Sequence, residues 1–118
     1  MAVRNSAAAG LVLAFAAQGA GAVSFQTGTE LVAECGSDKV TEQSFCNGFL
    51  AGMAEAHDLY RNWYGMKPAW CMPAGVTTAD LRKSVTGYGT RHQAELTQPA
   101  GAIAANAFTE TYPCAPAP

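Results

Sequence analysis

The sequence lacks a surplus of positive charge: it has 7 Lys and Arg against 9 Asp and Glu, a net charge of −2 at pH 7. Proteins that bind DNA or RNA neutralise phosphates with Lys and Arg, so this balance excludes a nucleic-acid function. The sequence also lacks the GxGxxG and GxxxxGK[ST] loops that hold phosphates, which argues against dinucleotide and nucleotide enzymes. With 118 residues and no internal repeat, the chain is expected to form one domain.

No apolar run is long enough to cross a membrane. The longest, over residues 7–17, falls well short of the roughly 20 residues that a membrane-spanning helix needs. It follows Arg4 and precedes Ala20-Gly21-Ala22, the small-x-small pattern of a secretory cleavage site. We therefore predict a signal peptide over residues 1–22, cleaved after Ala22, and a periplasmic mature chain that does not associate with the membrane. The alternative is a buried N-terminal helix.

The predicted mature chain contains four cysteines, Cys35, Cys46, Cys71 and Cys114. An even number of cysteines in an exported protein indicates disulfides, which form in oxidising compartments. A zinc site would need close ligand pairs such as CxxC, which the spacing does not provide, and a catalytic thiol would be expected to pair with another cysteine. We predict two disulfides and no metal site.

Strand-forming residues are scarce. After residue 22 there are one Ile and five Val against 15 Ala, a composition that favours helix. The clearest helix runs from about residue 42 to residue 64, and we expect its wide apolar and aromatic arc to lie in the core. Gly48, Gly52 and Ala56 follow a small-xxx-small spacing that favours close approach of another backbone, within the molecule or from a second subunit.

Three shorter helices are predicted around it. The first spans about residues 27–34, the second begins at Thr77, where Thr77 and Asp80 match a capping box, and the third begins at Pro99. The first helix is expected to face inward with Leu31, Val32 and Cys35, and the last with Ile103, Ala107, Phe108 and Tyr112; Leu81, Val85, Tyr88 and His92 follow one face of the helix between them. Residues 65–75 and most of residues 90–98 are predicted to be loops.

This layout favours one of the three cysteine connectivities. The first two helices form a hairpin that brings Cys35 near Cys46, which leaves Cys71 to pair with Cys114. The predicted fold class is therefore all-α: a small single-domain helical bundle of about four helices over residues 23–114, stapled by two disulfides. Residues 115–118 are predicted to be a disordered tail.

Catalytic motifs are missing. The sequence has no HExxH, GxSxG or paired-acid spacing, and its two imidazoles are those of His57 and His92. His57 adjoins Asp58, but consecutive helical residues point about 100° apart, so we do not expect the two to act as an acid–base pair. We interpret His57, on the apolar arc, as a hydrogen-bonded core residue and His92 as a solvated one. We predict no catalytic site and no cofactor, which indicates a binding or inhibitory module rather than an enzyme.

Several motifs occur in order: Cys46-x-Gly48-Phe49-x-x-Gly52, Cys71-x-Pro73-x-Gly75-Val76-Thr77, Leu81-Arg82, Ala107-Phe108 and Tyr112-Pro113-Cys114. Over about residues 27–114 the chain thereby resembles the Rap/Tai family of small periplasmic immunity proteins of type VI secretion systems. The resemblance implies a compact, disulfide-bonded, all-helical protein, often a homodimer, that binds a cognate peptidoglycan amidase and blocks its active-site cleft. The matching residues belong to the scaffold, and the inhibitory contacts do not transfer.

The leading hypothesis is therefore an inhibitor of a secreted cell-wall amidase effector. The alternative is a periplasmic stress or chaperone-like binding protein without a dedicated effector, and a hydrolase would lack a visible catalytic constellation. Protein interfaces centre on a few aromatic and Arg anchors. Our predicted partner-binding residues are Trp70, Arg91, His92 and Glu95, and we interpret the polar segment of residues 88–98 as a contact loop or an ordinary connector.

Overall fold

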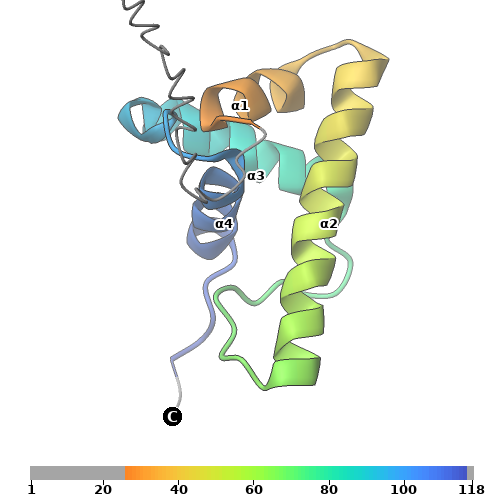
Figure 1. Cartoon of the computed structure of the whole chain (residues 1–118), viewed down its shortest axis with the longest axis vertical. Coiled ribbons are helices and arrows are strands. Elements are labelled where there is room, and N and C mark those ends of the chain that lie inside the picture. The colour runs from red at the N-terminus through yellow and green to blue at the C-terminus, as the bar shows by residue number, and fades with distance from the viewer. Residues whose placement is uncertain (1–25, 117–118) are drawn as a thin grey trace, which may run out of the picture.

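The computed structural model of the chain describes residues 26–116, and these residues form a helical bundle (Figure 1). Its α-helices are α1 (Gly28–Gly36), α2 (Val40–Tyr64), α3 (Thr78–Arg91) and α4 (Ala100–Thr111), with a short 3-10 helix, η1 (Gln93–Glu95), before α4. Over residues 26–116 there is no strand, and the one isolated antiparallel bridge joins Thr27 to Pro99. The predicted all-α class and the number of helices are confirmed.

The predicted signal peptide, residues 1–22, lies outside the described residues, as do the last two residues of the predicted tail. The cleavage site after Ala22 therefore stays a prediction. Within the part of the chain that the structure describes, no helix has both the length and the apolar character to cross a membrane.

Capping boxes fix where α1 and α3 begin. The Thr27 hydroxyl accepts a hydrogen bond from the Glu30 N–H at 3.3 Å, and the Glu30 carboxylate accepts one from the Thr27 N–H at 2.8 Å. Thr77 and Asp80 form the same reciprocal pair, at 3.2 and 2.9 Å. Because both boxes satisfy backbone donors that a helix start leaves unpaired, the predicted starts of both helices are confirmed.

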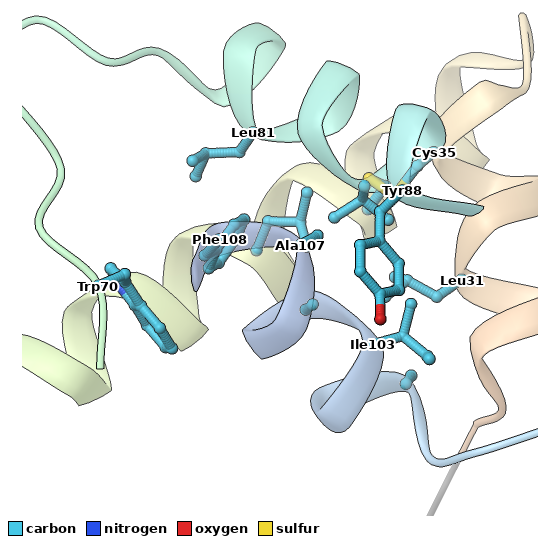
Figure 2. Close-up of a cluster of buried hydrophobic side chains, with 13 residues drawn as sticks. Leu31, Cys35, Trp70, Leu81, Tyr88, Ile103, Ala107 and Phe108 are labelled. Atoms are coloured by element: carbon cyan, nitrogen blue, oxygen red, sulfur yellow. A yellow bond between two sulfur atoms is a disulfide. The ribbon is translucent and has the colours of Figure 1, made fainter. Parts of the chain in front are cut away.

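The core lies between α1, α3, α4 and the N-terminal half of α2. Tyr88 reaches from α3 towards Ile103 of α4 and Leu31 of α1 (Figure 2). The largest fully buried side chains come from all four helices: Leu31, Cys46, Leu50, Val85, Ile103 and Phe108. The predicted inner faces of α3 and α4 are confirmed at Leu81, Val85, Tyr88, Ile103, Ala107 and Phe108, all of which are buried.

Two disulfides join the elements as predicted. Cys35, at the end of α1, pairs with Cys46 in the second turn of α2. Cys71, in the loop after α2, pairs with Cys114, beyond the end of α4. The Cys71 N–H also donates to the Tyr112 carbonyl oxygen at 2.8 Å, so the loop and the C-terminal segment are held together by a covalent bond and a hydrogen bond.

The C-terminal half of α2 extends past the other three helices (Figure 1). The helix ends at Tyr64, where Gly65 adopts a left-handed conformation with φ of 62° that a glycine accepts without strain. The loop of residues 65–77 then returns beside this half of α2 towards α3 (Figure 1). Within the described part of the chain, one side of this long helix therefore has no neighbouring helix.

Candidate functional site

The apolar arc of α2 lies only partly in the core, so the prediction that the whole arc is buried is wrong. Cys46 and Leu50 are buried, but Phe45 is 50% exposed and Trp63 is 76% exposed. The arc is wider than one contact can cover, and α1, α3 and α4 reach only one flank of the helix. We call the exposed flank the outer face of α2; it comprises Phe45, Phe49, Gly52, Ala56, Leu59 and Trp63, of which Phe49 is partly buried.

The glycines of α2 have no close neighbour. Among residues 26–116, a Cβ built on Gly48 or Gly52 would meet no atom within 4 Å beyond the backbone of its own helix. The expectation that their small size serves packing within the molecule is therefore wrong. The subunit-contact interpretation stays a prediction.

A pocket of about 250 Å³ lies beside the outer face, between α2 and the loop that follows it. We call it the α2–loop pocket. Its lining is mostly apolar and consists of Met53, Ala56, His57, Tyr60, Arg61, Met66, Lys67, Ala69 and Trp70. Small-molecule sites usually measure about 300–1,000 Å³, so this pocket fits a single protruding side chain better than a cofactor.

One wall of this pocket is rigid because His57 and Trp70 fix each other. Their rings stack with centroids 4.0 Å apart, and His57 Nε2 accepts the Ala69 N–H at 3.0 Å. The indole also meets the ring of Phe108 edge-on, with centroids 5.3 Å apart. The interpretation of His57 as a hydrogen-bonded, largely buried residue is confirmed. Trp70 is on the predicted loop, but at 6% exposure its side chain is part of the core.

The rim of the α2–loop pocket combines exposed aromatic, apolar and basic side chains. Tyr60 stacks at a tilt on Tyr64, with ring centroids 5.5 Å apart, and both rings are more than half exposed. Met66 is 56% exposed in the loop. Arg61 and Lys67 also line the pocket and bring positive charge to its edge. Tyr and Arg are the residue types in which binding energy concentrates at protein interfaces.

The other predicted partner-binding residues are tied into the fold. Arg91 Nε donates to Glu110 at 3.0 Å, His92 Nε2 lies 2.8 Å from the second Glu110 carboxylate oxygen, and Tyr88 donates to Glu95. Arg91 and then His92 hold the pKa of the Glu110 carboxyl below its usual value, while the Glu95 hydrogen bond and burial raise the pKa of Tyr88. His92 also stacks on Tyr88, so the expectation that it is simply solvated is wrong.

The predicted contact segment, residues 88–98, is attached to the start of α1. Gly28 N–H donates to the Gln98 carbonyl oxygen at 2.8 Å, and Thr29 N–H donates to the Leu96 carbonyl oxygen at 2.9 Å. Arg91 belongs to the last turn of α3 rather than to a loop. A partner-binding role for Arg91, His92 and Glu95 stays a prediction, and such a partner would meet a fixed surface.

A second hollow, wide and open, lies where α3 faces the end of α4. It has a volume of about 620 Å³ and is lined by Ala74, Gly75, Val76, Asp80, Lys83, Ser84, Arg91, Thr111 and Tyr112. Ser84 is engaged there, donating to the Ala107 carbonyl oxygen at 3.1 Å and lying 2.7 Å from the Thr111 hydroxyl. Residues 26–116 hold no group of three or more His, Cys, Asp or Glu side chains placed to bind a metal ion.

The strongest candidate site is thus the outer face of α2 together with the α2–loop pocket. The sequence-based prediction missed Tyr60 because it assigned the aromatic arc to the core, and it placed Met66 and Lys67 in a loop without giving them a role. The width of the apolar arc of α2 could have indicated an exposed site, because an arc that covers more than half of a helix can form two contacts at once.

Comparison with known proteins adds one finding about the whole unit. The sequence model of a family described as Rap1a immunity proteins matches residues 27–114, which include all four α-helices and both disulfides. No curated protein and no solved structure matches the chain.

Proposed function

We propose that this chain, which belongs to the family of Rap1a immunity proteins, binds a secreted peptidoglycan amidase effector in the periplasm and blocks its active-site cleft. Membership implies immunity against a secreted effector, and proteins of this kind are generally not enzymes. The amidase, its delivery by a type VI secretion system and the periplasmic location are the specific parts of the proposal. The two disulfides support an oxidising compartment.

The observation that carries the proposal is the α2–loop pocket, a preformed apolar recess with an exposed aromatic and basic rim. An apolar side chain of the effector would enter the recess, and a neighbouring acidic group would meet Arg61 or Lys67. Because the His57–Trp70 stack already holds one wall in place, binding would not have to order it.

Blocking would be steric and stoichiometric. A standard protein–protein interface buries about 1,600 Å² in total, far more than the pocket alone, so the effector would also cover surface around the rim. Such an inhibitor stops substrate from entering the cleft without taking part in any reaction. Two copies joined as a homodimer would offer two α2–loop pockets, one on each copy.

The experiment is a titration of peptidoglycan cleavage by a secreted amidase encoded beside this gene, one with a Cys–His signature. Purified protein is expected to abolish cleavage near one-to-one stoichiometry. Met66→Asp, which places a charge at the apolar edge of the pocket, should weaken inhibition at least tenfold, while Asn62→Asp, on an exposed part of the same helix outside the pocket, should not.

Two outcomes would contradict the proposal. Full inhibition by Met66→Asp would remove the α2–loop pocket from the interface. If the protein leaves the amidase active but holds many denatured proteins in solution, its exposed aromatic surface serves the alternative chaperone-like function.

A further inference from the structure

We propose that the ion pair of Asp58 and Arg61 binds a main-chain peptide group of the partner, next to the apolar side chain that enters the α2–loop pocket. The two charged residues line a second pocket of about 310 Å³, which we call the Asp58 pocket. The inference rests on the proposed function, because it states the chemistry that the same site recognises, but its test needs no effector.

The Asp58 pocket adjoins the α2–loop pocket. Both lie between α2 and the loop of residues 65–77, which run side by side (Figure 1). The Asp58 pocket is lined by Ala54, Asp58, Arg61, Trp70, Cys71 and Met72. Arg61 and Trp70 also line the α2–loop pocket, so a ligand that fills one pocket lies next to the other.

The Asp58–Arg61 pair has unused hydrogen-bonding capacity. Arg61 Nη1 lies 3.5 Å from Asp58 Oδ1, whereas an N–H···O hydrogen bond measures about 2.7–3.2 Å. Within residues 26–116 neither side chain makes a hydrogen bond, and the two are 66% and 40% exposed. A partner can therefore reach Asp58 Oδ2 as an acceptor and Arg61 Nε and Nη2 as donors without breaking an existing hydrogen bond.

His57 approaches the same carboxylate from the buried side. Its Nε2 atom accepts the Ala69 N–H, so the proton of the neutral ring lies on Nδ1. This buried Nδ1 atom has no hydrogen-bond partner among the described residues and lies 3.5 Å from Asp58 Oδ1, the oxygen that also faces Arg61. Two donors thus attract one carboxylate oxygen, which leaves Oδ2 for a ligand.

A peptide group suits this pair better than a charged group does. Its carbonyl oxygen would accept from Arg61, and its N–H would donate to Asp58 Oδ2. Hydrogen bonds to charged groups are stronger than those between neutral groups, so both contacts favour binding. A carboxylate would gain Arg61 but be repelled by Asp58, and an ammonium group would gain Asp58 but be repelled by Arg61.

The position of the two pockets indicates that this peptide group comes from the main chain of the partner. Any residue whose side chain enters the α2–loop pocket carries a peptide group on each side of its Cα, and Arg61 lines both pockets. One partner residue can therefore fill the first pocket and meet the ion pair in the second. An acidic group of the effector at the rim would then meet Lys67.

The test titrates the oxidised protein with two probes that keep the side chain of leucine. N-Methyl-4-methylpentanamide contains one peptide group, and methyl 4-methylpentanoate replaces its N–H by an ester oxygen. Nitrogen-15 NMR should show shifts of the Cys71 and Met72 amides and of the Trp70 indole N–H at amide concentrations up to about 50 mM, because so small a ligand binds weakly. The ester should bind at least threefold more weakly, since it cannot donate to Asp58.

Variants separate the two halves of the ion pair. Asp58→Ala should weaken binding of the amide at least threefold and leave binding of the ester unchanged, because only the amide has an N–H. Arg61→Ala should weaken binding of both probes, since both present a carbonyl oxygen. Glu55→Ala removes the same charge as Asp58→Ala from an exposed part of α2 outside both pockets, and it should bind both probes like the wild type.

The proposal is overturned if the amide causes no shifts, if amide and ester bind equally, or if Asp58→Ala binds the amide like the wild type. Tighter binding of 4-methylpentanoate than of the amide would also overturn it, because the site would then take a carboxylate. A protein that inhibits the amidase without preferring the amide refutes this inference alone. A protein that prefers the amide but leaves the amidase active refutes the proposed function alone.

Discussion

The imidazole of His57 lies flat against the indole of Trp70, with ring centroids 4.0 Å apart, and its Nε2 atom accepts the N–H of Ala69. The His57 side chain is 11% exposed. One residue of α2 thereby holds both the backbone and a side chain of the loop that closes the α2–loop pocket. The contact connects the stability of the fold to the shape of its candidate binding surface.

His57→Ala should lower the free energy of unfolding by about 2 kcal/mol. The substitution leaves the Ala69 N–H without its acceptor and removes one face of the stack on Trp70. Urea unfolding followed by circular dichroism measures the loss. Trp70 fluorescence, recorded with Trp63→Phe in the background, should shift to the red. Asn62→Ala is the control and should change stability by less than about 0.5 kcal/mol; a His57→Ala variant as stable as this control would contradict the prediction.

Gly89→Ala and Gly48→Ala should have opposite effects although both glycines are in helices. A Cβ at Gly89 would lie 2.8 Å from both methyl groups of Val32, so the contact between α1 and α3 would have to open, at a cost of about 1–3 kcal/mol. A Cβ at Gly48 meets no described atom within 4 Å, and Ala there should stabilise the monomeric protein by up to about 1 kcal/mol. Equal shifts in the urea midpoint would show that the close approach at Gly89 is not present.

Removal of either disulfide should weaken the fold, and the longer one should matter more. Cys71 and Cys114 are separated by 43 residues, and Cys35 and Cys46 by 11. Because each disulfide restricts the unfolded chain, these separations correspond to contributions of about 4 and about 3 kcal/mol to the free energy of unfolding. Paired Cys→Ser variants compared by urea unfolding check the order. Mass spectrometry of the folded, exported protein should find no free thiol, and four free thiols in folded material would contradict the arrangement.

Acid should destabilise the protein through carboxylates that are hydrogen-bonded in the folded state. Arg91 and His92 hold the pKa of the Glu110 carboxyl below its usual value, and the Thr77 cap lowers the pKa of Asp80. A group whose pKa falls on folding stabilises the protein above its unfolded pKa, and this contribution is lost as the pH falls through the folded value. Stability should therefore hold above about pH 5 and decline towards pH 3.

Glu110→Gln tests the origin of that decline. The variant should be less stable than the wild type at pH 6, and the difference in the free energy of unfolding should shrink as the pH falls through the lowered pKa of Glu110 and the wild-type carboxyl becomes protonated. Parallel curves across this range would mean that Glu110 does not contribute to the pH dependence.

Features set by neighbours in the sequence were predictable. Thr77 and Asp80 are three residues apart, and their capping box depends on nothing else in the fold. The pairing of Cys35 with Cys46 followed from the hairpin of the first two helices. The inner faces of α3 and α4 could be predicted because each of these short helices buries one narrow side.

Features set by distant residues were not predictable. His92 meets Glu110, which lies 18 residues later, so nothing near His92 indicated its partner. The sequence of α2 indicated how wide its apolar surface is, but not how much of that surface the other helices contact. That extent depends on their short length, which leaves Leu59 and Trp63 beyond them.

The bond between Cys71 and Cys114 has a consequence for where the protein can work. It anchors the residue next to Trp70, and with it the wall of the α2–loop pocket, to the far end of the chain. A newly made copy that still carries thiols lacks this anchor, and its pocket wall would be held by the stack of His57 on Trp70 and by hydrogen bonds alone. Oxidation of the two thiols would then complete the support of this wall, which links the shape of the candidate binding surface to an oxidising compartment.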